Sequence, residues 1–218
     1  MSVNLFDFKL FEGILPQSIE KIKNLKIERA EFDSNQLVVA KDSPLTHVIF
    51  IEKGLLKTVE YMIDGKEIVS SYYFEGDAFP FYLYFGSVDT FPYDAYAIRK
   101  TVVRLIPLRE FEKIMDEDIV LTKNVLKFVS EYTCFNKLVI RACQYTRVDQ
   151  RLAYWLLHQK EVDELKFPTT QTMLADILRV NRPGLNQELK KLSENKIIEK
   201  SKKGFKILDK DYLKSLIY

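Results

Sequence analysis

The chain contains 218 residues, 47% of them hydrophobic and 29% charged, with a net charge of only +2, which suits a globular protein of one large or two smaller domains. It has no run near the roughly 18 uncharged apolar residues of a membrane helix, and its acidic N-terminus without a small-residue cleavage site predicts no signal peptide. Cys134 and Cys143 are nine residues apart in one predicted helix, about 13 Å along its axis and too far for a disulfide, so we expect a reduced, cytoplasmic protein.

Residues 1–117 are predicted to form a β-rich domain that begins with a short amphipathic helix around Pro16. Between Glu28 and Pro107 the apolar residues alternate as in strands, in the segments 36–40, 46–54, 55–63 and 66–74. The pair Asp64-Gly65 predicts a β-hairpin with a type I′ turn, which requires positive φ at both residues. Short strands at intervals of roughly ten residues predict an antiparallel sandwich or roll.

Residues 118–147 are predicted to form a long helix and a hinge, after a short helix at 108–115. Apolar residues recur at alternating spacings of four and three, as in a heptad seam. The predicted seam comprises Leu121, Val125, Phe128, Tyr132, Phe135, Val139 and Ala142. We expect a two-fold dimer interface along it; the alternative is a long helix that packs on its own domain.

Residues 148–218 are predicted to form a winged helix-turn-helix. Thr170 is a suitable N-cap for one helix and Asn181 for the next, whose first turn contains Pro183, where a missing N–H removes no helical hydrogen bond. Two short helices joined by a tight turn favour a helix-turn-helix. The β-type runs around Lys202 and Lys203 within residues 197–209 predict the wing.

This C-terminal segment is also basic. Residues 149–218 hold 14 Lys and Arg against 10 Asp and Glu, a net charge of +4, whereas residues 1–148 hold 19 against 21, a net charge of −2. A basic domain favours a polyanionic partner. The residue types that read base edges are Arg182, Asn186 and Gln187. The candidates for contact with the DNA backbone are Thr170, Gln171, Lys190, Lys191, Lys202 and Lys203.

This order of a β-roll, a heptad helix and a winged helix-turn-helix resembles the CRP/FNR family of bacterial transcription regulators. The specific marks are Gly54 after VIFIEKG, the Asp64-Gly65 hairpin, Glu-Gly-Asp at 75–77, Val-Asp-Gln-Arg-Leu-Ala at 148–153 and the motif 170–192. The resemblance implies an α+β fold and a homodimer that reads a palindromic site in double-stranded DNA, with RNA polymerase as a partner if the protein is an activator.

The chain departs from the family pattern at two positions of the helix-turn-helix. Arg179 stands where the family usually has a glycine, and a left-handed conformation there costs roughly 1 kcal/mol or more, so we expect a reshaped turn. Pro183 replaces a common base-contacting glutamate, which implies a different operator preference.

The resemblance also raises the question of a small-molecule effector. Members that bind cyclic AMP carry a glutamate and an Arg-Ser pair in the roll, whereas this chain has Phe81, Phe91 and Pro92 at the positions that look equivalent. A buried phosphate without a cation is poorly solvated, so we do not expect cyclic AMP to bind.

Instead, residues 71–96 hold eleven Phe or Tyr residues. These rings either fill the roll or border a pocket for an apolar or aromatic effector of unknown identity. The residues that would border such a pocket are Phe81, Tyr82, Tyr84, Phe91, Tyr93 and Asn136, with the helix face near Phe128 and Tyr132.

Two further classes of protein are weighed against the regulator. A cupin-like β-roll metalloenzyme needs clustered His and Glu ligands, which the isolated His47 and His158 do not supply, so we expect no enzyme, metal or cofactor. The other alternative is a ligand-binding module that acts only through protein contacts. Cys134 is either a modifiable thiol beside the seam or, as we expect, a plain buried cysteine.

Overall fold

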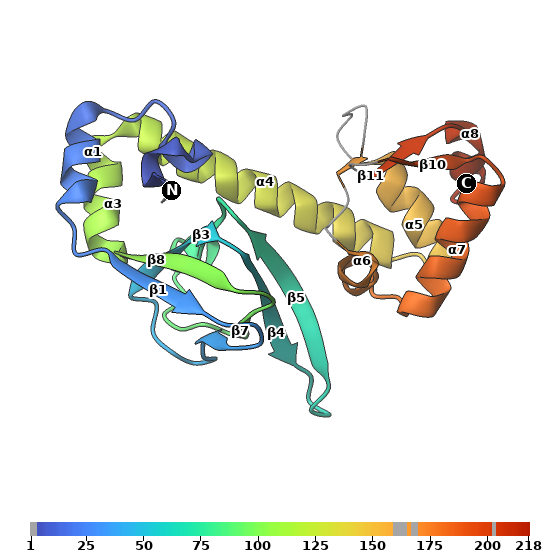
Figure 1. The fold of residues 1–218 in the computed structure, drawn as a ribbon, viewed down its shortest axis with the longest axis horizontal. Coiled ribbons are helices and arrows are strands. Elements are labelled where there is room, and N and C mark those ends of the chain that lie inside the picture. The colour runs from blue at the N-terminus through green and yellow to red at the C-terminus, as the bar shows by residue number, and fades with distance from the viewer. Residues whose placement is uncertain (1–3, 159–164, 167–169, 202–203) are drawn as a thin grey trace. The chain divides into compact units, whose positions relative to one another are not determined.

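The fold is seen in a computed structural model, which describes residues 4–158, 165–166, 170–201 and 204–218 (Figure 1). The chain divides into two compact units, residues 1–132 and 133–218, and the helix α4 (Ile119–Cys143) contributes to both. Within the described residues, no helix combines the length and the apolar character needed to cross a lipid bilayer.

The first unit is a β-roll of two four-stranded sheets with helices on one side. One sheet has the order β1-β8-β3-β6 and the other β2-β7-β4-β5, and the paired strands are antiparallel. The strands are β1 (Glu28–Phe32), β2 (Leu37–Val39), β3 (His47–Lys53), β4 (Leu55–Tyr61), β5 (Glu67–Phe74), β6 (Ala78–Phe79), β7 (Asp94–Ala97) and β8 (Thr101–Pro107). The helical elements are η1 (Leu5–Asp7), η2 (Lys9–Phe11), α1 (Pro16–Lys23), α2 (Phe81–Tyr84) and α3 (Leu108–Glu117). The predicted antiparallel roll is confirmed.

Strand β3 is apolar on both faces because both faces are covered. Successive strand residues point to opposite sides. Val48 and Phe50 belong to the cluster that packs against the helices, whereas Ile49 and Ile51 belong to the cluster between the two sheets. A continuous apolar run is therefore what this central strand requires.

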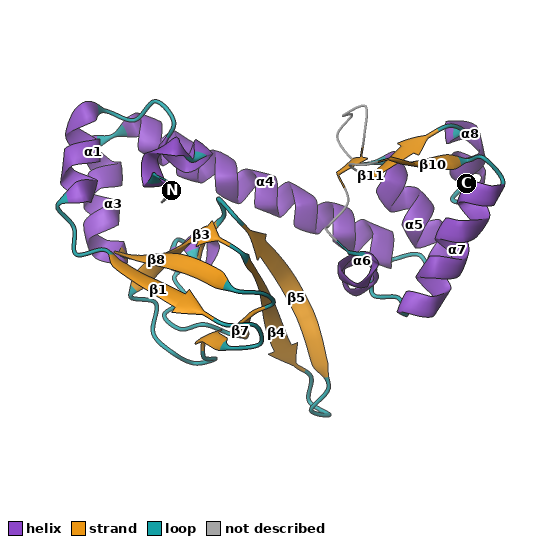
Figure 2. Cartoon of the chain, in the orientation of Figure 1, coloured by secondary structure: helices purple, strands orange, loops and turns teal. Residues whose placement is uncertain are grey.

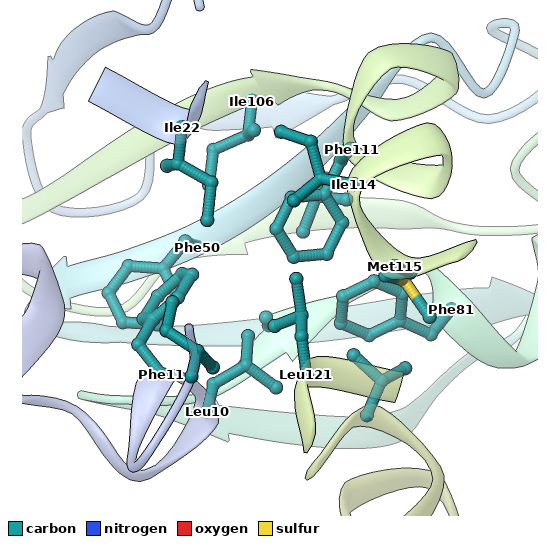
Figure 3. Packing of buried hydrophobic residues seen from close by; sticks show 14 of the residues in the cluster. Leu10, Phe11, Ile22, Phe50, Phe81, Ile106, Phe111, Ile114, Met115 and Leu121 are labelled. Atoms are coloured by element: carbon teal, nitrogen blue, oxygen red, sulfur yellow. The ribbon is translucent and has the colours of Figure 1, made fainter. Parts of the chain in front are cut away.

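The helix-facing cluster holds the beginning of α4 against the roll. Figure 3 shows Phe11, Phe50, Phe111 and Leu121 converging in this cluster, and α1 lies beside α3 (Figure 1). At the start of α4 the buried Asp118 accepts hydrogen bonds from the amides of Val120 (2.9 Å), Leu121 (3.1 Å) and, before α1, Leu15 (2.8 Å). One carboxylate thus caps the long helix and fixes the N-terminal segment.

The turn between β3 and β4 requires a glycine. Gly54 has φ +117°, and a Cβ atom there would lie 2.7 Å from the Cα atom of Thr101. Both the left-handed backbone and the close approach of another strand exclude a side chain.

The predicted hairpin between β4 and β5 is present, but its predicted turn type is wrong. Gly65 has positive φ and Asp64 does not. The amide of Gly65 donates to Met62 O (2.9 Å), and the amide of Met62 donates to Lys66 O (2.9 Å). This is a three-residue loop in which only the last residue is left-handed, so the single glycine suffices.

Within the described residues, the second unit contains the end of α4, four further helices and a small antiparallel hairpin, which Figure 2 shows by type. The elements are α5 (Val148–Leu157), β9 (Leu165–Lys166), α6 (Gln171–Leu178), α7 (Arg182–Glu194), β10 (Ile198–Ser201), β11 (Gly204–Ile207) and α8 (Lys210–Ser215). Strand β11 pairs with β10 and β9. The core is formed by side chains of every helix in the unit, among them Trp155, Leu178, Leu189 and Leu213.

Candidate nucleic-acid interface

The segment 170–194 forms two helices with the predicted caps. The Thr170 Oγ1 atom accepts from the amide of Met173 (3.2 Å), and the Asn181 Oδ1 atom accepts from the amide of Gly184 (2.7 Å). Pro183 lies in the first turn of α7, where its missing N–H removes no intrahelical bond. Gly184 also has a local role, because a Cβ atom there would lie 2.9 Å from the capping Asn181 Oδ1.

The turn between α6 and α7 keeps a left-handed residue, so the expectation of a reshaped turn is wrong. Arg179 has φ 55° and ψ 44°. Its amide donates to Asp176 O (3.2 Å), and the amide of Val180 donates to Ala175 O (3.0 Å), which closes the end of α6. A non-glycine residue held at positive φ costs about 1–3 kcal/mol, which other contacts of the turn have to offset.

Helix α7 has one buried and one exposed face. Leu185, Leu189 and Leu192 are buried, as predicted. Arg182 is exposed at the beginning of the helix and Gln187 in its second turn. Exposed Arg and Gln side chains on a helix anchored by three leucines are free to contact an external surface.

Asn186 is less exposed to solvent than Arg182 and Gln187, the other two candidate base-contacting residues. It is half-buried, and its Oδ1 atom is buried with no hydrogen-bond partner among the described residues. A bidentate contact to adenine uses both amide atoms. Asn186 therefore needs a change of rotamer before it can read a base in that way.

The candidate phosphate contacts lie at several places around α7. Lys190 and Lys191 are exposed, at 3.6 Å from Glu194 and 3.7 Å from Glu188. Exposed pairs of this kind are weak, so both ammonium groups can exchange a carboxylate for a phosphate. Thr170 and Gln171 are exposed at the start of α6. Lys202 and Lys203 lie outside the described residues.

The structure places only part of the predicted seam on the surface of α4. Leu121 and Val125 are buried in the first unit and Ala142 in the second, so the prediction that these three residues meet a second chain is wrong. Phe128 packs on the first unit's core, with its ring 6.4 Å from that of Phe81. For the first half of α4, the alternative of a helix packed on its own domain describes the structure.

Tyr132, the next seam residue, also packs on its own unit, whereas Phe135 is exposed and Val139 half-buried. A second stripe of α4 is open instead. Ile119, Leu126 and Ile140 are 62–63% exposed, and they share one heptad position with the exposed Thr133. Residues seven apart lie on one side of a helix.

The predicted effector pocket is filled by its own aromatic side chains in this structure. Phe81, Phe91 and Tyr93 are buried in the core and are not open to a ligand. Tyr84 donates to the carboxylate of Glu112, and Asn136 lies in the other compact unit. The remaining gap is about 10 Å³, lined by Tyr73, Ala78, Phe79, Phe81, Tyr82, Phe128, Val129 and Tyr132. That volume is about right for one water molecule.

The gap lies among phenol groups, and Tyr73 and Tyr82 are among the residues that line it. Among the described residues, the buried Oη atoms of Tyr73 and Tyr93 have no hydrogen-bond partner. Burial raises the pKa of Tyr82 to about 12 and lifts the pKa values of Tyr73 and Tyr93 above the usual range. The phenols are therefore neutral O–H groups.

Cysteine and metal chemistry add little to the site. Cys134 is exposed, so the expectation of a buried cysteine is wrong. Its position on α4 falls between the two stripes, where nothing covers it in the single chain. The part of the chain that the structure describes contains no group of three or more His, Cys, Asp or Glu residues placed to hold a metal ion.

A β-roll joined through a long helix to a winged helix-turn-helix defines a class of DNA-binding regulators, and comparison with known proteins agrees. The Cyclic nucleotide-binding domain model matches residues 29–118, and the Crp-like helix-turn-helix domain model matches residues 150–216. The chain belongs to the CRP/FNR family of transcription regulators, which are not enzymes. The family therefore excludes the cupin-like metalloenzyme.

Solved structures with the same fold are distant in sequence. A CooA mutant from Carboxydothermus hydrogenoformans has a TM-score of 0.72 at 15% identity, over 100% of this chain and 97% of that one. FixK2 from Bradyrhizobium japonicum has a TM-score of 0.65 at 17% identity, over 89% and 98% of the two chains. A putative crp/fnr-family transcriptional regulator from Eubacterium rectale has a TM-score of 0.58 at 18% identity, over 96% and 98%. A search of curated protein sequences found no match.

Proposed function

We propose that this regulator reads a palindromic operator as a homodimer, in the cytoplasm, through Arg182, Gln187 and, after a rotamer change, Asn186. The observation that carries the proposal is the first two turns of α7, where a capped helix presents exposed Arg and Gln side chains above a buried leucine face. In a helix-turn-helix, the N-terminal residues of the second helix contact base edges in the major groove.

The proposal assigns nonspecific affinity to the lysines and polar groups around the reading helix. Lys190 and Lys191 follow on α7, and Thr170 and Gln171 begin α6. Phosphate contacts fix the position of a protein on the duplex without reading its sequence. The net charge of +4 in residues 149–218 supports this division of roles.

For the dimer, we propose the open stripe of α4 as the contact, in place of the buried residues of the predicted seam. Ile119, Leu126 and Ile140 would meet their counterparts across a two-fold axis. Apolar residues at heptad spacing are what a parallel helix pair buries. Such a pair would bring two α7 helices to one palindromic site.

The β-roll, in this proposal, controls the regulator without binding cyclic AMP. No Lys or Arg is among the residues that line its gap, so a cyclic phosphate would be buried without a counter-charge. The buried hydroxyl of Tyr73, which lines the gap, favours a small effector with an apolar or aromatic body and a hydrogen-bond acceptor. Such a ligand enters only if the aromatic rings move apart.

The decisive experiment is selection of preferred duplexes from a random pool by the full-length protein, with and without cell extract. We expect an inverted repeat whose half-sites lie one helical turn apart, and footprinting should show protection of both halves. A protein that selects no sequence under either condition would refute operator reading. A preference that appears only with extract would identify a need for an effector.

A further inference from the structure

Arg151, on α5, joins the end of the long helix to the turn of the helix-turn-helix. Its Nε atom donates to Tyr145 O (2.6 Å), and its Nη1 atom donates to Leu178 O (3.0 Å) and Arg179 O (2.8 Å). Tyr145 is two residues beyond the end of α4, whereas Leu178 is the last residue of α6 and Arg179 is its C-cap, in the turn before the reading helix. A single guanidinium therefore bonds to two segments more than 30 residues apart.

The turn needs this contact for two reasons. The last carbonyls of a helix have no partner within the helix, and Arg151 supplies donors to two of those at the end of α6. The bonds also hold the peptide at Arg179, whose left-handed backbone is costly for a residue with a side chain. Bonds from a charged donor are stronger than neutral ones.

Neighbouring contacts tie the same two segments together. The Cys143 Sγ atom, at the end of α4, lies 3.6 Å from Leu178 O. The ring of Tyr145 lies 5.4 Å from that of Tyr154 on α5. The end of α4 is thus joined to the end of α6, and the segment after α4 is joined to α5. Arg151 adds charged bonds to carbonyls of both segments.

We propose that Arg151 is a positioning residue for operator reading, which sets the direction of α7 relative to the end of α4 without touching DNA. Its three acceptors are backbone carbonyls, so the requirement falls on the planar fork of a guanidinium and not on charge alone. A movement of residues 144–147 must then either carry the α6–α7 turn along or break these bonds. The proposal rests on the proposed function, because duplex preference is its main readout.

The test compares Arg151→Lys and Arg151→Gln with the unaltered full-length protein. Affinities for the preferred duplex and for a random duplex are measured over a range of salt concentrations. We expect both variants to lose about tenfold in preference, since the strained turn then loses the charged donors that hold its carbonyls. The dependence of affinity on salt should not change, because no phosphate contact is removed.

Two outcomes of this comparison would overturn the proposal. An unchanged preference in both variants would show that Arg151 does not orient α7. A salt slope lower by about one would instead make Arg151 a phosphate contact. As the control, Arg141→Gln removes the same charge from an exposed position near the end of α4 and should leave the preference intact.

A second substitution separates positioning from a general loss of stability. Arg179→Gly relieves the left-handed strain, so it should recover part of the preference lost in Arg151→Lys while changing the preference of the unaltered protein little. Purely additive effects of the two substitutions would contradict the proposed link. If Arg151→Gln does not fold, Arg151→Lys and the double variant decide the question.

Hydrogen exchange gives a readout that does not depend on DNA. The amides of Arg179 and Val180 close the end of α6, and they should exchange faster in Arg151→Lys than in Arg141→Gln. Equal exchange rates would show that Arg151 does not hold the α6–α7 turn, even if operator reading is correct. Conversely, faster exchange in a protein that prefers no duplex would refute the proposed function but would support the role of Arg151 in holding the turn.

Discussion

The hydroxyl groups of Tyr132 on α4 and Ser71 on β5 lie 2.6 Å apart, and the Tyr132 ring is stacked on those of Tyr73 and Tyr82. The middle of the long helix is therefore held to the roll by a hydrogen bond and by two ring contacts. Any change in the roll that moves these rings must move α4 at the same point.

Removal of that hydrogen bond should weaken the first unit. Tyr132→Phe keeps the ring and deletes the hydroxyl, so we expect the free energy of unfolding to fall by about 0.5–1.5 kcal/mol. Urea denaturation of the full chain measures the change. Tyr218→Phe, which deletes a hydroxyl from an almost fully exposed ring, serves as the control and should have no effect.

The open stripe of α4 makes a prediction about assembly. Leu126→Glu places a charge on the proposed dimer contact and should give monomers in light scattering with an unchanged melting temperature of the roll. Phe128→Glu places the charge against the core and should destabilise the first unit itself. Lys127→Glu, at an exposed neighbouring position, should remain dimeric. A dimeric Leu126→Glu protein would contradict the proposed interface.

The two kinds of DNA contact should separate in binding measurements. Arg182→Ala should lower the preference for the operator by about 1–3 kcal/mol, because a bidentate contact to a base is lost. Lys190→Gln combined with Lys191→Gln should lower affinity for all duplexes alike and reduce the salt slope by up to about two. Lys113→Gln on α3, in the other unit, is the charge control. Loss of preference from the lysine pair, but not from Arg182→Ala, would reverse the assignment.

Asp77 should make stability depend on pH. Burial raises its pKa to about 6, although the Phe74 amide at 2.7 Å opposes the shift. The folded state binds the proton more tightly than the unfolded chain does. The resulting contribution of Asp77 to the free energy of unfolding is therefore complete below about pH 4. It is lost as the pH rises toward 6. We therefore compare the free energy of unfolding of the unaltered protein with that of Asp77→Asn, from urea midpoints. The unaltered protein should lose stability relative to the variant between pH 4.5 and pH 7. A constant difference would refute the shifted pKa.

Cyclic AMP should leave the melting temperature unchanged at millimolar concentration, because ligands that bind the folded state raise it. Differential scanning fluorimetry of the full chain checks this expectation. A rise that grows with ligand concentration would show that the aromatic rings of the roll do open to admit a phosphate.

The sequence predicts those features that are set by local chemistry. The caps Thr170 and Asn181, the proline in the first turn of α7 and the buried leucines all follow from helix rules and are confirmed. The hairpin after Tyr61 is also confirmed, but a dipeptide alone does not decide between a two-residue and a three-residue loop, and the structure has the latter.

The face of α4 could not be chosen from the sequence, because this helix carries two apolar stripes. Leu121 and Val125 have the more complete heptad pattern, yet their own unit buries them. The repeat of Ile119, Leu126 and Ile140 is visible in the sequence but is interrupted by Thr133. Only tertiary contacts show which stripe is left open. Arg151 was likewise visible only as part of a family motif, since its acceptors are backbone atoms far along the chain.

Asp118 has a practical consequence for work with shortened versions of this protein. Its carboxylate accepts from Leu15 as well as from the first turn of α4. A truncated chain that starts after residue 15 would leave a carboxylate oxygen short of one donor at the foot of the long helix, at a cost of about 1–3 kcal/mol. The N-terminal residues accordingly stabilise the start of the long helix and should be retained when tags or fusion partners are attached.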